Sequence, residues 1–237
     1  MSSNVHPSLQ NQAIQNQALL PTWHGYVRTT MDALILFEAC LSGQLSHVSR
    51  RPHDRERADL IISGNTFIYE EHASGIKRWT DGFNWSPSRI LGNFLIYREL
   101  ERAFAPGEKK KALKKKSTPA PKGGITKPSD NQQRSNTTAL GAAAATADSP
   151  PNDEDRALVG SLVDSYPFKE GGLIKKTMCI NWNGISHHLV SYYNIDDVKN
   201  HHLQRVTEDP RLAHIVPRSA LISGGNFRTP VDQDDIF

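Results

Sequence analysis

The segment from Gly75 to Arg89 concentrates side chains that could bind a polyanion. Its fifteen positions hold two tryptophans, three cationic residues and two glycines. Glycine lets the backbone approach a ligand closely, and arginine or lysine at a loop tip can enter a narrow, electronegative minor groove. On composition alone, a surface loop whose tryptophans cover the core is the better supported interpretation, because exposed basic loops are common.

A second candidate for anion binding is Lys175-Lys176, at the start of a predicted hairpin. Alternation along a strand sends neighbouring side chains to opposite faces, so at most one of the two lysines can lie on a given DNA surface. A solvated strand end and a phosphate contact agree about equally well with the sequence here.

A lysine-rich segment dominates the charge of the chain. Residues 107–150 contain nine basic and three acidic residues, a net charge of +6, whereas the other residues contain 19 basic and 22 acidic residues, a net charge of −3. Nucleic-acid binding by the folded part would therefore depend on local patches. The lysines could act as a nuclear localisation signal, a non-specific DNA tether or a solvated linker, and these roles are compatible. The candidate signal comprises Lys109, Lys110, Lys111, Lys114, Lys115 and Lys116.

Metal binding and catalysis have little support in the sequence. His187 and His188 would point to opposite faces of a strand, and no His-x-x-x-His or CxxC spacing is present. Cys40 and Cys179 lie in apolar stretches and are expected to be buried and reduced. Asp81 could be imagined as the general base of a hydrolase that also uses a histidine, but a turn-forming aspartate is the simpler interpretation. We therefore expect no cofactor, no metal and no enzyme activity.

Local signals predict both helices and strands. Thr29 and Asp32 resemble a capping box ahead of an apolar run, and Ser86-Pro87 resembles a helix start with proline at its first position. The mean hydropathy of −0.53, without an apolar run near the roughly 18 residues that a spanning helix needs, argues against a membrane protein. The predicted elements are a helix at 33–41, a helix at 54–64, a strand at 66–69, a loop at 71–81, a packed element at 90–102 after the helix start, and a short helix within 196–206.

The clearest local signal is a hairpin within residues 173–193. Ile174, Met178, Ile180 and Trp182 fall on one strand face, and Asn183-Gly184 is the residue pair preferred by a tight type I′ turn. A two-residue loop places Trp182 opposite Ile185, Ile180 opposite His187, and Met178 opposite Leu189.

Two patterned blocks are separated by a segment that cannot bury enough apolar surface to fold. Each block alone has too few strands for a stable sheet, so we expect the blocks to complete one another in a single α+β domain with a shared antiparallel sheet and flanking helices. The expected organisation is a disordered leader at 1–20, a first half at 21–105, a basic disordered linker at 106–154, a second half at 155–222 and an acidic tail at 223–237.

The loop sequence also carries a family resemblance. Lys77-Arg78-Trp79-Thr80-Asp81-Gly82, followed by Trp85-Ser86-Pro87-Ser88-Arg89, closely resembles the signature of the WOPR-domain family of fungal transcription regulators, the gluconate-transport-inducer type. The resemblance covers both blocks, about two thirds of the chain. Supporting segments are Gly25-Tyr26-Val27, Asp32-Ala33-Leu34, Phe37-Glu38-Ala39-Cys40, Tyr97-Arg98-Glu99, Gly172-Leu173-Ile174-Lys175-Lys176 and His188-Leu189-Val190-Ser191-Tyr192-Tyr193.

The resemblance implies a sequence-specific DNA-binding regulator that acts in a fungal nucleus on morphology, sexual development or nutrient response. It implies a loop around Arg78 that reaches double-stranded, AT-rich DNA through the minor groove. For Lys175-Lys176, the resemblance favours phosphate contact over a solvated strand end. The DNA-binding residues expected on this basis are Lys77, Arg78, Trp79, Thr80, Asp81, Gly82, Arg89, Lys175 and Lys176.

Two further hypotheses concern the same loop. Thr80 follows a basic pair at a spacing that basophilic kinases accept, so its phosphorylation could switch DNA binding off. A threonine that merely caps the turn is the other interpretation. Alternatively, the chain could be a non-enzymatic adaptor that presents Trp79 and Trp85 to a protein partner.

Overall fold

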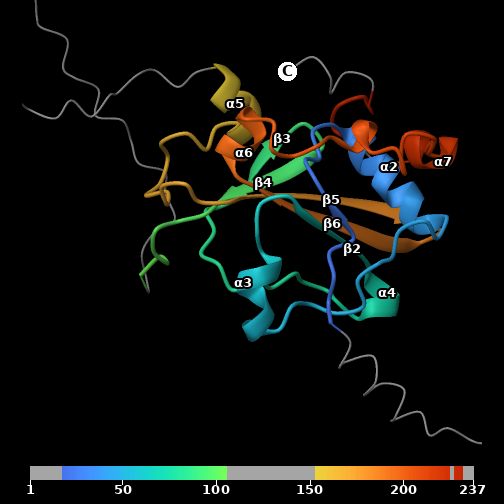
Figure 1. The fold of residues 1–237 in the computed structure, drawn as a ribbon, viewed down its shortest axis with the longest axis horizontal. Coiled ribbons are helices and arrows are strands. Elements are labelled where there is room, and N and C mark those ends of the chain that lie inside the picture. The colour runs from blue at the N-terminus through green and yellow to red at the C-terminus, as the bar shows by residue number, and fades with distance from the viewer. Residues whose placement is uncertain (1–17, 106–152, 225–226, 232–237) are drawn as a thin grey trace, which may run out of the picture.

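One antiparallel sheet organises residues 18–105, 153–224 and 227–231, which are the residues that the computed structural model describes. The strand order in this part of the chain is β1-β2-β6-β5-β4-β3 (Figure 1). The strands are β1 (Trp23–His24), β2 (Asn65–Glu70), β3 (Arg89–Leu91), β4 (Phe94–Arg98), β5 (Ile174–Trp182) and β6 (Ile185–Tyr193).

The β5–β6 hairpin forms in the expected register. Trp182 pairs with Ile185, Ile180 with His187, and Met178 with Leu189. Asn183 has a φ of 51° and Gly184 a φ of 80°, the left-handed pair that a type I′ turn requires. The predicted hairpin is therefore confirmed.

The sheet interleaves two distant parts of the chain. β6 pairs with β2 and β5 pairs with β4, so the hairpin of the second half lies between strands of the first half. The prediction of an α+β fold with a shared antiparallel sheet is thus confirmed.

On the C-terminal side, Val231 packs in a buried apolar cluster, which extends the second half beyond residue 222.

Separate pieces of the chain are expected to fold only together. Residues 1–105 lack the two central strands, and residues 153–237 lack both neighbours of the hairpin, so neither piece can complete the sheet. Mixing the two pieces should restore the circular dichroism spectrum and the cooperative thermal transition of the intact chain. A cooperative transition in residues 1–105 alone would contradict this prediction.

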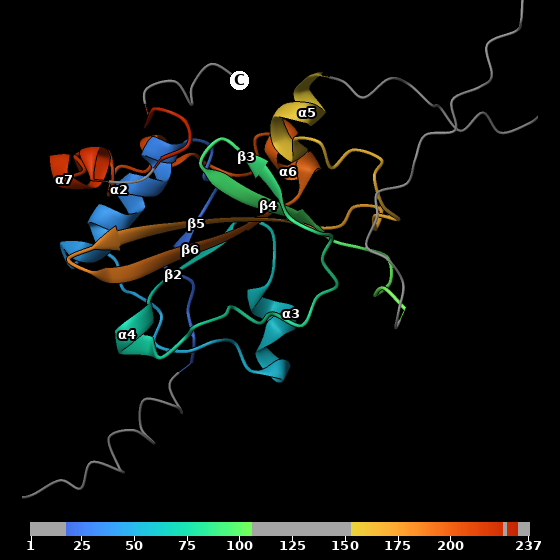
Figure 2. The same cartoon turned by 180° about the vertical axis from the view of Figure 1, so that it is seen from behind.

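Helices cover both faces of the sheet (Figure 1 and Figure 2). One face carries α2 and α7, with α5 and α6 beside β3 and β4, and the other face carries α3 and α4. None of the described helices is long and apolar enough to cross a membrane. The helices are α2 (Thr30–Leu41), α3 (Arg57–Leu60), α4 (Glu71–Ser74), α5 (Asp153–Val159), α6 (Ile195–Lys199) and α7 (Ser219–Ser223).

The capping box of the first long helix forms as expected. The amide of Asp32 donates to the Thr29 hydroxyl at 3.0 Å, and the Thr29 amide donates back to the Asp32 carboxylate at 3.1 Å. This closes the N-terminus of α2, whose apolar residues pack against Ile68, Met178 and Leu189 of the sheet.

Four local predictions are wrong. The loop expected at 71–81 begins with a short helix, α4, because the Glu70 side chain caps the amide of Ala73. Ser86-Pro87 does not begin a helix: residues 89–98 form the β3–β4 hairpin, because Gly92 turns the chain with a φ of 56° and Phe94 and Ile96 alternate into the core. The helix expected at 54–64 ends at Leu60. Cys179 is exposed, because strand alternation directs it away from the face that α2 covers.

Candidate nucleic-acid interface

The loop at residues 76–88 crosses the sheet face opposite α2. It begins after α4 at Gly75, where a φ of 67° ends the short helix. Its side chains divide by direction: Ile76 is buried and Trp79 half-buried, whereas Lys77 and Arg78 are exposed. The loop therefore packs on the sheet through apolar residues and presents its cations outward.

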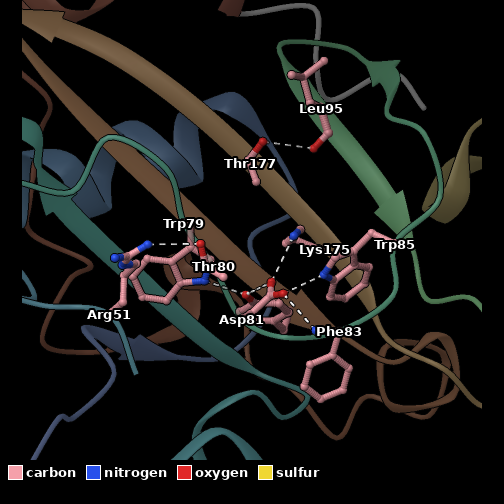
Figure 3. Close-up of polar contacts among 10 residues, drawn as sticks. Arg51, Trp79, Thr80, Asp81, Phe83, Trp85, Leu95, Lys175 and Thr177 are labelled. Atoms are coloured by element: carbon pink, nitrogen blue, oxygen red, sulfur yellow. Dashed lines mark hydrogen bonds and ion pairs between the residues drawn. The ribbon is translucent and has the colours of Figure 1, made fainter. Parts of the chain in front are cut away.

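Asp81 fixes the base of this loop through a buried polar network (Figure 3). Its side chain is only 4% exposed, and its Oδ2 atom accepts hydrogen bonds from Lys175 Nζ at 3.0 Å and from the Tyr192 hydroxyl at 2.7 Å. The Oδ1 atom accepts from the indole of Trp85 at 2.8 Å and from the Phe83 amide at 3.3 Å. The carboxylate thus joins the loop to both central strands.

The pKa shifts in this network have clear physical causes. Burial alone would raise the pKa of Asp81, but the Lys175 charge and the hydrogen bonds from Trp85 and Tyr192 outweigh it and hold that pKa below its ordinary value. Burial lowers the pKa of Lys175, and Asp81 opposes that change. Burial and the neighbouring carboxylate raise the pKa of Tyr192, so its hydroxyl remains a donor.

The two tryptophans of the loop cover the core. Trp79 donates its indole N–H to the Tyr192 hydroxyl at 2.7 Å and stacks on Tyr69 with the ring centroids 5.7 Å apart. The Trp85 ring receives the Lys175 ammonium 4.4 Å from its centroid. Both tryptophans position the loop in this structure.

The backbone conformation of Gly82 favours glycine, because its φ of 81° lies in the left-handed region. A Cβ atom at this position would meet the flexible end of the Arg57 side chain from α3. The loop therefore packs closely against α3 at Gly82.

Lys77 and Arg78 lie where two surface hollows meet. The first, which we call the sheet hollow, has a volume of about 570 Å³ and is also lined by Tyr97, Lys175 and Arg228. The second, which we call the arginine hollow, has a volume of about 830 Å³. Its lining includes five arginine and lysine residues but a single acid, Asp54.

Arg51 joins the arginine hollow to the loop, and the sequence interpretation missed it. Its Nη1 atom donates to the Thr80 hydroxyl at 3.1 Å (Figure 3). The same atom lies 3.4 Å from the Arg78 carbonyl. Arg50 instead binds Glu56, and Arg57 binds Asp54. The available signal was the presence of four arginines within residues 50–57, to which the sequence interpretation gave no role.

Lys175 and Lys176 point to opposite faces, as strand alternation predicts. Lys175 enters the Asp81 network, whereas Lys176 donates to the carbonyls of Val27 at 3.0 Å and Arg28 at 2.8 Å. Both lysines are buried. In this structure their ammonium groups bind other residues of the chain, whereas the sequence interpretation expected contact with DNA phosphates. Arg89 is half-buried and donates to the Tyr166 hydroxyl at 3.0 Å.

The surroundings of Asp81 and of the histidines bear on the hydrolase and metal hypotheses. The hydrogen-bond partners of the Asp81 carboxylate include no histidine, which leaves the hydrolase interpretation without its second group. Within the described ranges, no three His, Cys, Asp or Glu side chains are grouped so that they could hold a metal ion. The lysine run at 109–116 lies outside the described residues.

Comparison with protein families decides the classification. The model of the Gti1/Pac2 family matches residues 22–194, which include the loop and both central strands. The chain belongs to the Gti1/Pac2 family. The family resemblance found in the loop sequence is therefore confirmed.

Individual relatives of this Gti1/Pac2 chain carry names of regulators. It is 59% identical over 220 residues to "Global transcription regulator sge1" of Gibberella fujikuroi, covering 91% of this chain and 65% of the relative. It is 32% identical over 291 residues to "White-opaque regulator 1" of Candida albicans, covering 94% of this chain and 36% of the relative. The chain thus spans about two thirds or less of the length of these relatives.

The fold of the Gti1/Pac2 chain matches a solved protein–DNA complex. The similar structure is the WOPR domain of Wor1 of Candida albicans with a 13-bp double-stranded DNA, at a TM-score of 0.54 and 31% sequence identity. The match covers 86% of this chain and 95% of the solved chain.

Proposed function

We propose that this chain is a sequence-specific DNA-binding transcription regulator whose 76–88 loop reads the DNA. The observation that carries the proposal is that Lys77 and Arg78 are exposed on a loop whose base is held to the sheet. Asp81 holds it by accepting hydrogen bonds from Lys175 and Tyr192. A recognition group held in place before binding loses less conformational entropy when the complex forms. The likeness to a DNA-bound domain supports the same function.

AT-rich DNA is the partner that this loop suits best. A-tracts have a narrow minor groove with enhanced negative potential, which attracts an inserted arginine. Arg78 is exposed, and its neighbours Lys77 and Arg51 add positive charge. Within this proposal, the reading groups are positioned by Trp79, Asp81, Gly82 and Lys175. Arg89 and Lys176 instead hold neighbouring segments, through Tyr166 and through the carbonyls of Val27 and Arg28.

The arginine hollow would bind DNA phosphates beside the groove. Arg51→Gln should weaken binding to all duplexes by a similar factor and reduce the slope of log affinity against log salt by about 1, because one phosphate contact is lost. Affinity titrations of AT-rich and GC-rich duplexes across salt concentrations measure both quantities. Arg55→Gln is the matched control, since Arg55 is exposed in the same segment but does not line the hollow. Equal effects of the two changes would contradict a specific role for Arg51.

Regulation by a basophilic kinase is a further part of the proposal. Thr80 is exposed, and its hydroxyl accepts a hydrogen bond from Arg51. Phosphorylation would add about −1.5 to −2 charges, enough to occupy Arg51 and to offset the loop cations. Thr80→Glu should therefore lose DNA binding while Thr80→Val retains it, with equal thermal stability in both. If Val fails as badly as Glu, the hydroxyl itself is needed and the switch is wrong.

Nuclear action follows from this function, and control of morphology, sexual development or nutrient response remains part of the same proposal. Lys109–Lys116 stay the candidate localisation signal. Replacing their six lysines should reduce nuclear accumulation without changing the preferred DNA motif.

The adaptor alternative is less well supported. Trp79 and Trp85 donate their indole N–H groups to Tyr192 and Asp81, so neither is free to anchor a partner without breaking the network. Binding to an AT-rich duplex that falls steeply with salt supports the DNA-binding function. Absence of duplex binding at low salt would contradict the DNA-binding function and favour the adaptor interpretation.

A further inference from the structure

A separate cavity lies on the sheet face opposite the 76–88 loop. Lys176 reaches it from β5, whereas the adjacent Lys175 reaches the loop. The cavity has a volume of about 580 Å³ and is bounded by the β3–β4 turn, α5 and α6. This volume falls within the range of roughly 300–1,000 Å³ that small-molecule sites occupy.

The walls of this cavity are largely apolar. Tyr26 and Phe94 contribute aromatic rings, and Leu158, Val198 and Leu203 contribute aliphatic side chains. Burial raises the pKa of Tyr26 to about 12, so its phenol stays neutral at ordinary pH. Such walls suit the hydrocarbon or aromatic body of a ligand.

Cationic groups converge on the same space. Arg28, Lys176, Lys199 and Arg205 line the cavity, and Glu154 is the acid among its lining residues. Lys199 is paired with Asp155, but Arg205 approaches Asp32 only to 3.7 Å. The Nε atom of Arg205 is buried and has no hydrogen-bond partner among the described residues. Four arginine and lysine residues against one acid give the lining an excess of positive charge, which favours an anionic ligand.

We propose that this cavity binds a small organic anion with an apolar body. The anionic group lies near Arg28 and Arg205, and the body packs between Tyr26, Phe94 and the side chains of α5 and α6. The site is distinct from the proposed DNA interface, because the sheet separates the two.

Fluorescence titration with anilinonaphthalene sulfonate tests this site, because the probe joins an anion to an aromatic body. The intact folded chain should bind one equivalent saturably. Phenylnaphthylamine, which has the same body without the charge, should bind at least about tenfold more weakly. Equal affinity for the charged and uncharged probes would overturn the proposal.

Two variants locate the binding. Ala157→Trp fills the cavity from an exposed position on α5, and Arg28→Gln removes a cation. Each should weaken sulfonate binding by about tenfold or more with an unchanged thermal unfolding midpoint. Arg51→Gln, on the opposite sheet face, is the control and should leave binding unchanged.

Three further outcomes would overturn the proposal. They are binding that does not saturate, binding that neither cavity variant weakens, and binding that Arg51→Gln weakens as much as Arg28→Gln does.

Discussion

Asp81→Asn is expected to destabilise the fold by about 3–5 kcal/mol, because it leaves the buried Lys175 ammonium without a counter-charge. The substitution also weakens the hydrogen bonds from Trp85 and Tyr192 that tie the loop to the sheet. DNA binding should fall together with stability, since the loop loses its anchor. Urea unfolding of the variant and the parent chain measures the free-energy difference.

A double variant separates the ion pair from the rest of the network. Lys175→Met in the Asp81→Asn background removes the unpaired charge, so it should recover part of the lost stability. Asp59→Asn is the matched control, because Asp59 is exposed on α3 and should change stability by less than about 0.5 kcal/mol. A loss below about 1 kcal/mol for Asp81→Asn would contradict the role given to this network.

Arg78→Ala is expected to remove sequence preference while leaving the fold intact. A groove-inserted arginine contributes about 1–3 kcal/mol of discrimination, which corresponds to roughly 5-fold to 150-fold in affinity for the preferred duplex. Because Arg78 is exposed, the free energy of unfolding should change by less than about 0.5 kcal/mol. Competition between AT-rich and GC-rich duplexes measures the loss.

Lys77→Ala is the matched control for Arg78. Lys77 is its exposed neighbour, and an ammonium that contacts phosphate should weaken both duplexes by a similar factor. An unchanged duplex preference in Arg78→Ala would remove this arginine from the reading of DNA sequence.

Local sequence signals predicted the elements that depend on neighbouring residues. Asn183-Gly184 fixed the turn and thereby the register of β5 and β6, and Thr29 with Asp32 marked the start of α2. Ser86-Pro87 failed as a helix signal because the alternation of Phe94 and Ile96 into the core favours strands over the local capping preference.

The centre of the candidate site depends on contacts between distant residues. Asp81 and Lys175 are separated by 94 positions in sequence, so no local pattern shows that they form a buried pair. The same holds for Arg51, which donates a hydrogen bond to Thr80 across 29 positions of sequence. The sequence therefore could not show that Asp81, Lys175 and Lys176 have internal hydrogen-bond partners, and DNA contact by the loop stays a prediction.

Selection from a random duplex library, performed in parallel with the intact chain and with Arg78→Ala, shows whether Arg78 reads the DNA sequence. The intact chain should enrich an AT-rich motif, and Arg78→Ala, equally folded, should enrich none. Enrichment of the same motif by both proteins, or of no motif by the intact chain, would contradict this prediction.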